Sequence, residues 1–391
     1  MNDLDRVRLA RVGLSCLVEP GNPVVYELVT SDGPEAALRR MADGDVPSED
    51  LRGAVAARLR GGDPYAIAAD ALGHAARLGA RVAIPEDDEW PRPLDDLVRL
   101  AESGAATRVD RDVFPPLCLW VRGGLPLAET LNRSVAVVGS RAATGYGTHV
   151  ATDLGYGLAE RGWTVVSGGA FGIDAAAHRG ALATGGPTVA VLACGADRPY
   201  PLGHAALFDR IADGGLLVTE WPPGAEPFRH RFLVRNRVIA AATRGTVVVE
   251  AAARSGARQT LGRARRLDRT AMVVPGPVTS AMSVGCHELL RSDPNVRLVT
   301  GVDQVMEEVG LIGADLAPVP RGPERTEDRL DPATSQVYEA LRRRRAVGVD
   351  EVAARAGVDI RTAMRQLSLL DELGLATRRD GDWVLTQRRK T

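Results

Sequence analysis

Short runs of apolar, mostly β-branched residues recur through the middle of the chain, and most are followed within a few residues by glycine or proline. The runs lie at 135–138, 164–167, 188–192, 216–219, 246–249 and 271–274. Runs of this kind are typical of strands buried on both faces of a parallel sheet. Between the first two, Val150, Leu154 and Leu158 recur at helical spacing before Gly162 ends the helix. The pattern predicts strand–helix repeats in an α/β fold with a mostly parallel sheet.

The loops that follow these strands are the expected place for function. Connections between parallel strands are right-handed, so most of these loops lie along one edge of the sheet. Ligands bind at that edge in folds of this class.

The pattern changes on both sides of this region. Apolar residues at helical spacing near the start, Leu38 and Met41 and further on Ala54 and Leu59, alternate with Gly and Pro turns. Further on, four prolines and many charges have the composition of a linker. The predicted organisation is a small helical domain over 1–77, the α/β core over 78–312, a linker over 313–332 and a C-terminal domain over 333–391.

The last domain combines helices with a hairpin. The expected elements are a helix over 334–345, a helix capped by Asp350 and ending at Gly357, a helix from 359 or 360 to 373, and a hairpin with an Asp-Gly turn at 380–381. This order predicts a winged helix. Its third helix presents only Arg361 and Arg365 as cations, so a duplex-DNA contact and a protein contact both fit.

Charge is unevenly distributed, although the formal net charge is only −1. Residues 225–270 contain eleven arginines against Glu226, Glu250 and Asp268, a local net charge of +8. Residues 1–50 are acidic, with ten acids against five arginines. A local basic segment is what phosphate binding requires.

The four cysteines are far apart and form no CxxC pair, so neither a zinc site nor a disulfide framework is expected. The first residues are charged and contain no apolar signal core. No apolar run approaches the roughly 18 residues that span a bilayer. We therefore expect a cytoplasmic protein without a metal and without membrane contact.

The first candidate site follows the strand at 135–138. Gly139 allows a ligand to approach the backbone, Arg141 offers a charged fork, and the next helix offers free N–H groups to a phosphate. Ser140 lies between them. The spacing is not GxGxxG, so a dinucleotide site is not indicated. A tight turn without a ligand is the alternative.

The second candidate is a glycine-rich loop after the next strand. Gly168 and Gly169 permit close backbone approach, and Asp174 could cap the following helix. His178 on that helix could act as a base, but a structural role is the stronger interpretation.

The third candidate is the basic segment, where Arg229, Arg231, Arg235 and Arg237 alternate around Phe232. Arginines of this kind suit the backbone of a single strand while the ring stacks on a base. The alternative is a solvated basic loop with the ring in the core.

The fourth candidate is Glu250, which follows a strand, together with Ser255 and Gly256. It reads as another phosphate-facing loop that enters a helix. A plain helix N-cap at Ser255 is the alternative.

These segments together resemble the core of the DprA/Smf family of DNA-processing proteins. The matching runs, in the same order and with similar gaps, are VAVVGSRAAT, SGGAFGIDAAAH, VLACGADRPYP, RFLVRNRVIAA, VVVEAAARSGARQT and VVPGPV. FPPLCLWVRG resembles the lead-in strand of that family. The resemblance covers roughly residues 80–295. Departures affect loop detail: Leu233 stands where the family usually has proline, Gly169 where it has a tighter apolar residue, and ARQTLGRA replaces SLxTAxxA.

The resemblance implies an extended Rossmann-like fold that binds single-stranded DNA, forms a homodimer and loads RecA during natural transformation or recombination. It also implies an N-terminal helical domain of the SAM or helix-hairpin-helix type and a C-terminal winged helix. It places the DNA-binding pocket on Gly139, Ser140, Arg141, Arg229, the base-stacking Phe232, Arg235, Asn236, Arg237, Ser255 and Gly256. Arg231 and the loop at Gly168 and Gly169 complete the expected DNA-binding residues.

Two other functions stay open at this point. A nucleotide hydrolase of the phosphoribohydrolase type would use Glu250 or Asp174, although its PGGxGTxxE motif is missing. A regulator would bind duplex DNA through the winged helix. We expect a binding protein rather than an enzyme, without a cofactor.

Overall fold

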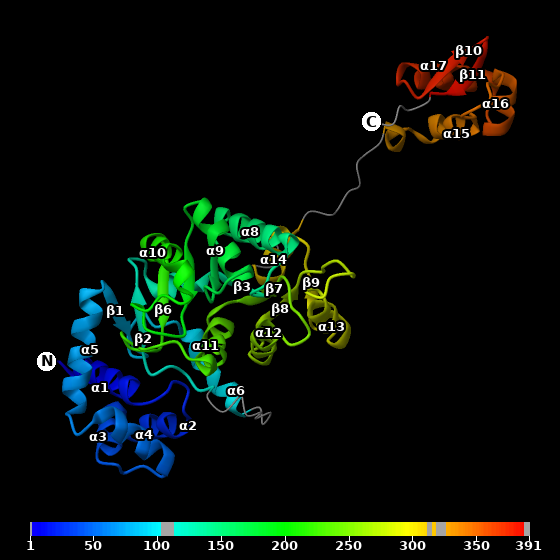
Figure 1. The fold of residues 1–391 in the computed structure, drawn as a ribbon. Helices are drawn as coiled ribbons and strands as arrows, with labels where there is room; N and C mark the ends of the chain where they lie inside the picture. The colour runs from blue at the N-terminus through cyan, green and yellow to red at the C-terminus, as the bar shows by residue number, and fades with distance from the viewer. Residues whose placement is uncertain (1, 103–112, 311–314, 318–325, 387–391) are drawn as a thin grey trace. The chain divides into compact units, whose positions relative to one another are not determined.

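The computed structural model describes residues 2–102, 113–310, 315–317 and 326–386, which fall into two compact units (Figure 1). The first unit is Met1–Ala317 and the second is Pro318–Thr391. The N-terminal helices belong to the same unit as the sheet, so a domain boundary at residue 77 stays a prediction. Part of the predicted linker over 313–332 lies outside the described residues.

A nine-stranded sheet runs through the first unit. Its strands are β1 (Ala80–Ala83), β2 (Leu119–Arg122), β3 (Ser134–Val138), β4 (Thr164–Ser167), β5 (Thr188–Val191), β6 (Leu216–Thr219), β7 (Gly245–Val248), β8 (Thr270–Val273) and β9 (Arg297–Leu298). They are ordered β1-β2-β6-β5-β4-β3-β7-β8-β9. The seven strands from β6 through β5, β4, β3, β7 and β8 to β9 are parallel to their neighbours. At the other edge, β1 pairs antiparallel with β2, and β2 pairs antiparallel with β6. The predicted mostly parallel α/β sheet and its lead-in strand are confirmed.

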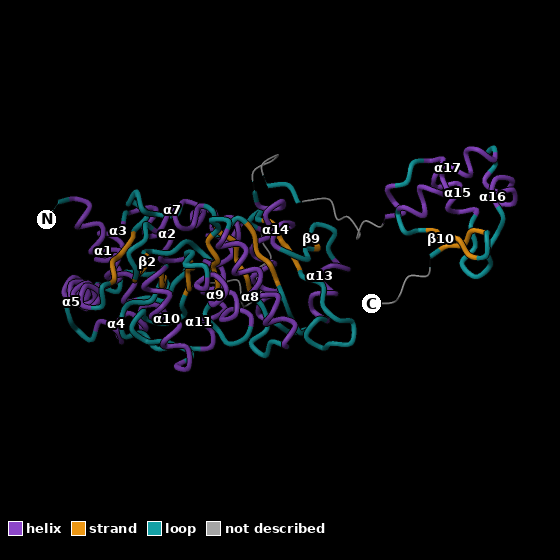
Figure 2. Tube along the Cα trace, turned by 90° about the horizontal axis from the view of Figure 1, so that it is seen from above, coloured by secondary structure: helices purple, strands orange, loops and turns teal. Residues whose placement is uncertain are grey.

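Helices cover both faces of this sheet, as Figure 2 shows. One face packs against α8 (Gly145–Glu160), α9 (Ile173–Ala183), α10 (Ala205–Gly214) and α14 (Val302–Val309). The other packs against α6 (Val98–Glu102), α7 (Leu127–Asn132), α11 (Arg229–Ala242), α12 (Gly256–Arg266) and α13 (Val284–Ser292). Along β3, Val135 and Val137 contact the first set of helices, and Ala136 and Val138 the second. Both faces are buried, which is why the strand is apolar at 135–138.

The position of β3 creates a crevice in the sheet. β3 pairs with β4 on one side and with β7 on the other, and Ala136 is opposite Val166 and Thr246. After β3, the chain adds β4, β5 and β6 on one side of that strand. It then crosses back and adds β7, β8 and β9 on the other side of β3. Helix α8 leaves β3 toward one face and α12 leaves β7 toward the other. Parallel sheets bind ligands at such a switch point, beyond the carboxyl ends of the strands.

Five helices precede the sheet: α1 (Asp3–Leu17), α2 (Pro23–Asp32), α3 (Pro34–Ala42), α4 (Glu49–Leu59) and α5 (Pro64–Arg77). Four of them begin at side chains that accept a hydrogen bond from the first turn: Asn2, Asn22, Ser48 and Asp63. They lie beside the β1 edge of the sheet (Figure 1). The helical prediction is confirmed, and Leu38 and Met41 are buried. Ala54 is exposed instead, because Leu51 and Val55 turn the apolar face of α4 inward.

Over residues 326–386, the second unit contains a short 3-10 helix (Thr326–Arg329), three α-helices and a hairpin. Its elements are α15 (Pro332–Ala340), α16 (Val349–Ala356), α17 (Ile360–Glu372), β10 (Ala376–Arg379) and β11 (Asp382–Leu385). Asp380 and Gly381 have φ of 54° and 91°, the left-handed turn that joins the strands. Two details correct the sequence prediction. The first helix ends at Ala340 rather than Arg345, because Leu341 turns into the core and leaves Arg342–Arg345 exposed. Asp350 lies inside the first turn of α16, whose cap is Gly348.

The described residues include no helix that is long and apolar enough to cross a membrane. All four cysteines are free thiols. Within the same residues, no cluster of three His, Cys, Asp or Glu side chains has the arrangement of a metal site.

Candidate nucleic-acid interface

A cleft of about 810 Å³ lies beyond the carboxyl ends of β3 and β7, where the order of the sheet reverses. The loops that follow β3, β4, β5 and β7 form it together with one face of α11 and the start of α12. Its polar and aromatic lining includes Ser140, Arg141, Asp174, Tyr200, Arg229, His230, Phe232, Arg235, Asn236, Arg254, Ser255 and Thr260. The structure thus brings together residues from all four candidate segments.

The two loops at the base of the cleft are fastened to each other. Ser140 N donates to the carbonyl of Glu250 at 2.8 Å. A Cβ on Gly139 would lie 2.5 Å from Ile173 Cγ1, so only glycine fits here. The group that approaches the backbone of Gly139 is therefore Ile173 of the protein itself. This contact fixes the backbone next to Arg141.

The N-terminus of α8 already holds an anion. Glu250 is buried, and its carboxylate accepts from Thr144 N at 2.9 Å and from Thr144 Oγ1 at 2.6 Å. Gly147 leaves the necessary space, because a Cβ there would lie 2.1 Å from Glu250 Oε2. A carboxylate is favourable at the positive end of a helix dipole. Glu250 thus takes the N–H of the N-cap residue, and Thr144 Oγ1 accepts from Gly147 N at 3.2 Å, so part of the N–H groups expected to face a phosphate is used within the protein.

The basic segment is a helix, and this determines which of its side chains reach the cleft. Phe232, Arg235, Asn236 and Ile239 line the cleft at spacings of three and four residues, the repeat of one helix face. Arg229 at the first turn lines it as well.

Arg235 forms the floor of the cleft. Its guanidinium is buried and donates to the carbonyl oxygens of Gly168, at 3.0 Å, and Val191. A Cβ on Gly168 would lie 2.4 Å from Arg235 Nη2, so this glycine makes room for the guanidinium rather than for a ligand. Gly169 does not line the cleft either; it has a φ of 69° and lies against Phe208.

Burial governs the titration of the groups around this floor. It lowers the pKa of Arg235 to about 10, which still leaves the guanidinium charged at neutral pH. It raises the pKa of Asp174, while the charge of Arg235 and backbone hydrogen bonds act against that shift. Asp174 accepts from Gly168 N and Ala170 N at 3.2 and 3.4 Å. It therefore braces the loop after β4 from the first turn of α9 and is not its cap, which is Gly172.

Phe232 lies between a cation and a second ring. Arg141 Cζ is 5.1 Å from the Phe232 ring centroid, and the Tyr200 ring centroid is 5.4 Å away on the loop after β5. Phe232 is half-buried and Tyr200 is exposed. Sequence reasoning missed Tyr200, although it lies within the run VLACGADRPYP. A cation, a ring and a second ring in contact suit a base and its phosphate.

Three cations are available at the rim. Arg141, Arg229 and Arg254 are exposed and line the cleft. None of the three has an ion-pair partner in the part of the chain that the structure describes. Asp174 is the one acidic side chain among the lining residues, and it is buried. The cleft therefore carries net positive charge toward solvent.

Two expected DNA contacts lie elsewhere. Arg237 is fully buried, and its Nη2 is 2.6 Å from Glu220 Oε1 at the end of β6. Arg231 is buried against Glu19, which follows α1. Arg237 points away from the cleft because α11 turns by about 100° per residue. Arg231 is four residues before Arg235, and its ion pair with Glu19 holds it outside the cleft. We leave them, with Gly168 and Gly169, out of the candidate site.

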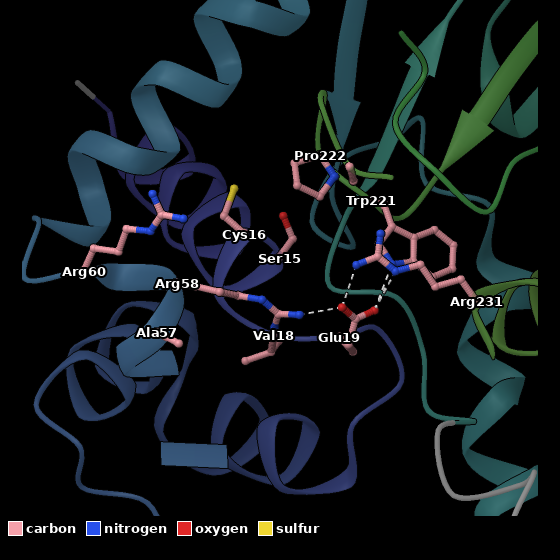
Figure 3. Close-up of a pocket in the computed structure, with 11 residues that line it drawn as sticks. Ser15, Cys16, Val18, Glu19, Ala57, Arg58, Arg60, Trp221, Pro222 and Arg231 are labelled. Atoms are coloured by element: carbon pink, nitrogen blue, oxygen red, sulfur yellow. Dashed lines mark hydrogen bonds and ion pairs between the residues drawn. The ribbon is translucent and has the colours of Figure 1, made fainter. Parts of the chain in front are cut away.

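Glu19 connects the N-terminal helices to α11, as Figure 3 shows. Its carboxylate accepts from Arg231 Nη2 at 2.7 Å, Trp221 Nε1 at 3.0 Å and Arg58 Nη2 at 2.5 Å, beside a cavity of about 380 Å³. Burial acts to raise the pKa of Glu19, but the hydrogen bonds from Arg231 and Trp221 outweigh it, and the pKa lies below its ordinary value.

We expect Glu19→Gln to lower the stability of the first unit by about 1–3 kcal/mol at pH 7, because it removes charge-assisted hydrogen bonds. The folded-state pKa is depressed, so this stabilisation is present above the ordinary pKa of about 4.3 and is lost as pH falls through the folded-state value. Thermal unfolding of both proteins at pH 7 and near pH 3 tests this. The control is Glu226→Gln, in an exposed pair with Arg198. An equal difference at both pH values would contradict the prediction.

The other titratable candidates have structural roles. His178 is buried with its Nδ1 2.8 Å from Thr188 Oγ1, and burial lowers its pKa to about 3. It is neutral at physiological pH and lies away from the cleft, in line with the structural interpretation. Ser255 Oγ accepts from Ala257 N at 3.3 Å and caps α12, while the residue also borders the cleft.

Known proteins match this chain over both its sequence and its fold. A family model described as DNA recombination-mediator protein A matches residues 81–310. A putative DNA processing protein DprA from Mycobacterium tuberculosis (strain ATCC 25618 / H37Rv) is 48% identical over 380 residues, which are 97% of this chain and 95% of that protein. The chain belongs to the DprA/Smf family.

Other DprA/Smf proteins agree. Protein Smf of Escherichia coli (strain K12) is 34% identical over 280 residues, 70% of this chain and 72% of that protein. The X-ray structure of DprA from Streptococcus pneumoniae aligns with a TM-score of 0.62 and 29% identity, covering 78% of this chain and 98% of that chain. The DprA family model includes every residue that lines the cleft.

Proposed function

We propose that the cleft binds single-stranded DNA. The observation that carries this is the contact of Phe232 with Arg141 and with Tyr200 in a cleft bordered by the exposed cations Arg229 and Arg254. Arginines at the rim bind the phosphates, and the rings receive an unstacked base. Ser140, Asn236, Ser255 and Gly256 complete the proposed lining, with Gly139 and Arg235 beneath it.

The rings favour a single strand over a duplex. The rings of Phe232 and Tyr200 lie within a cleft, and only a base outside a helical stack can place its face against them. The bases of a duplex are stacked on each other and leave only the backbone for the rim arginines. The same physical argument predicts tolerance of sequence, because every base has a π-face.

Membership of a family of recombination mediators supports the rest of the proposal. We propose that the bound strand is passed to the recombinase RecA in recombination or natural transformation, that the protein acts as a homodimer, and that it does so in the cytoplasm. The C-terminal unit adds a second contact, with duplex DNA or protein, since α17 exposes Arg361 and Arg365.

The geometry does not favour hydrolysis of a nucleotide. The carboxylate of Glu250 is buried and accepts two hydrogen bonds from Thr144. Asp174 is likewise buried and bound to the backbone of its own loop. We therefore propose a binding protein rather than an enzyme.

Fluorescence anisotropy of labelled single-stranded and duplex oligonucleotides at two salt concentrations tests the proposal. We expect tighter binding of the single strand, weakened by salt because phosphate contacts release counterions. Preference for the duplex would contradict it and turn attention to the winged helix. Loss of binding to both, with base release from nucleoside monophosphates, would favour the hydrolase.

A further inference from the structure

A second aromatic surface adjoins the cleft. Phe171, on the loop between β4 and α9, is 52% exposed, and Tyr200 is 43% exposed on the loop after β5. Leu202 on the same loop is exposed as well. We call Phe171, Tyr200 and Leu202 the aromatic ledge. Its Tyr200 end lines the cleft, and so does Ala170, the residue before Phe171.

The ledge is held in place by the protein beneath it. The Phe171 ring meets the ring of buried His204 at a centroid distance of 4.4 Å and an interplanar angle of 63°. His204 Nδ1 lies 3.0 Å from the carbonyl oxygen of Gly169, which ties the two loops together. Asp174 braces the loop of Phe171 from the other side through Gly168 N and Ala170 N. An exposed ring on a fixed support binds a flat partner without first losing conformational freedom.

We propose that the aromatic ledge is a second stacking site, which takes a nucleobase of the strand where it leaves the cleft. This inference rests on the proposed function. The ring centroids of Tyr200 and Phe232 are 5.4 Å apart, so the first stacking position adjoins the Tyr200 end of the ledge. The chemistry of the ledge is apolar and aromatic, in contrast to the arginine rim, and this fits bases rather than phosphates.

The position of the ledge predicts a dependence on strand length. An oligonucleotide that fills only the cleft does not reach Phe171, whereas a longer one does. The ring of Phe171 then contributes to affinity without changing the number of phosphates that are neutralised. Its removal therefore lowers the affinity for long strands and leaves the salt slope unchanged.

The experiment measures the affinity of the full chain for labelled oligothymidylates from about 4 to 16 nucleotides, a range that brackets known single-strand site sizes. We expect Phe171→Ala to weaken binding of the longest strands about 5- to 150-fold and to leave the shortest strands that bind unaffected. Phe171→Tyr, which keeps a ring, should bind like the natural protein. The matched control is Tyr156→Ala on α8, since Tyr156 is 44% exposed and does not line the cleft.

Other outcomes overturn the inference in different ways. If the natural chain binds and Phe171→Ala binds equally well at every length, the ledge is not a DNA site. An equal loss at all lengths would show that Phe171 supports the cleft itself and is not a second platform. If the natural chain binds no oligothymidylate of any length, both the proposed function and the ledge are wrong.

Discussion

Arg237→Ala is expected to lower the free energy of unfolding of the first unit by about 3–5 kcal/mol, the range for breaking a buried ion pair. Arg237 is fully buried on α11, and its guanidinium contacts Glu220 at the end of β6. Burial raises the pKa of Glu220, while Arg237 acts to lower it. Removing the arginine leaves a buried carboxyl group without its cation, and it also leaves a cavity between helix and sheet.

Urea denaturation followed by tryptophan fluorescence measures this effect, because four of the five tryptophans, Trp90, Trp120, Trp163 and Trp221, belong to the first unit. Arg122→Ala is the control, since its pair with Asp209 is at the surface and should cost at most about 1 kcal/mol. A double variant, Arg237→Met with Glu220→Gln, should recover part of the loss because no charge stays buried. If Arg237→Ala unfolds at the same urea concentration as the natural chain, the pair does not stabilise the fold.

The central sheet could be predicted from sequence because its strands are buried on both faces. Apolar β-branched runs have few other uses in a soluble α/β core, and β4 and β6 begin and end at the expected residues. The order of the strands in the sheet is harder to predict from sequence. That β3 pairs with β7 depends on contacts between residues about 110 positions apart, such as Ala136 and Thr246, and no local pattern records them.

The basic segment carries the charge that the sequence predicts, but only some of its arginines line the cleft. Counting charge between residues 225 and 270 treats all arginines alike, although a helix sends them in different directions. Testing that segment for a repeat of three and four residues would have grouped Phe232, Arg235 and Asn236 on one face. The same test would have separated Arg237 but not Arg231, which is four residues before Arg235. Their partners, Glu19 and Glu220, are distant in sequence, so the ion pairs themselves could not be predicted.

The glycines and Glu250 show a second limit. Glycine was expected wherever a ligand approaches the backbone, and the sequence cannot say whether the approaching group is a ligand or a side chain. At Gly139 it is Ile173, and at Gly168 it is Arg235. Glu250 in turn occupies the helix end that a phosphate was expected to use. Anion binding then depends on the rim arginines.

Replacing Arg141, Arg229 and Arg254 together by glutamine tests this dependence. The logarithm of the binding constant falls with the logarithm of salt concentration by about 0.7 for each phosphate contact to a single strand. Loss of three contacts should therefore reduce the slope by about 2, and at about 0.1 M salt it should weaken binding on the order of a hundredfold. All three side chains are exposed, so the fold should tolerate the change.

Two comparisons separate this effect from a general loss of charge. Replacing Arg39, Arg210 and Arg291 by glutamine removes three exposed arginines that do not line the cleft, and should leave the slope nearly unchanged. Phe232→Ala should lower affinity while the slope stays the same, because stacking releases no counterions. An equal reduction of the slope by both triple variants would mean that DNA responds to overall charge and that the cleft is not where the phosphates bind. A reduction confined to the rim variant would place the phosphates there, since no other difference between the two triple variants acts on counterion release.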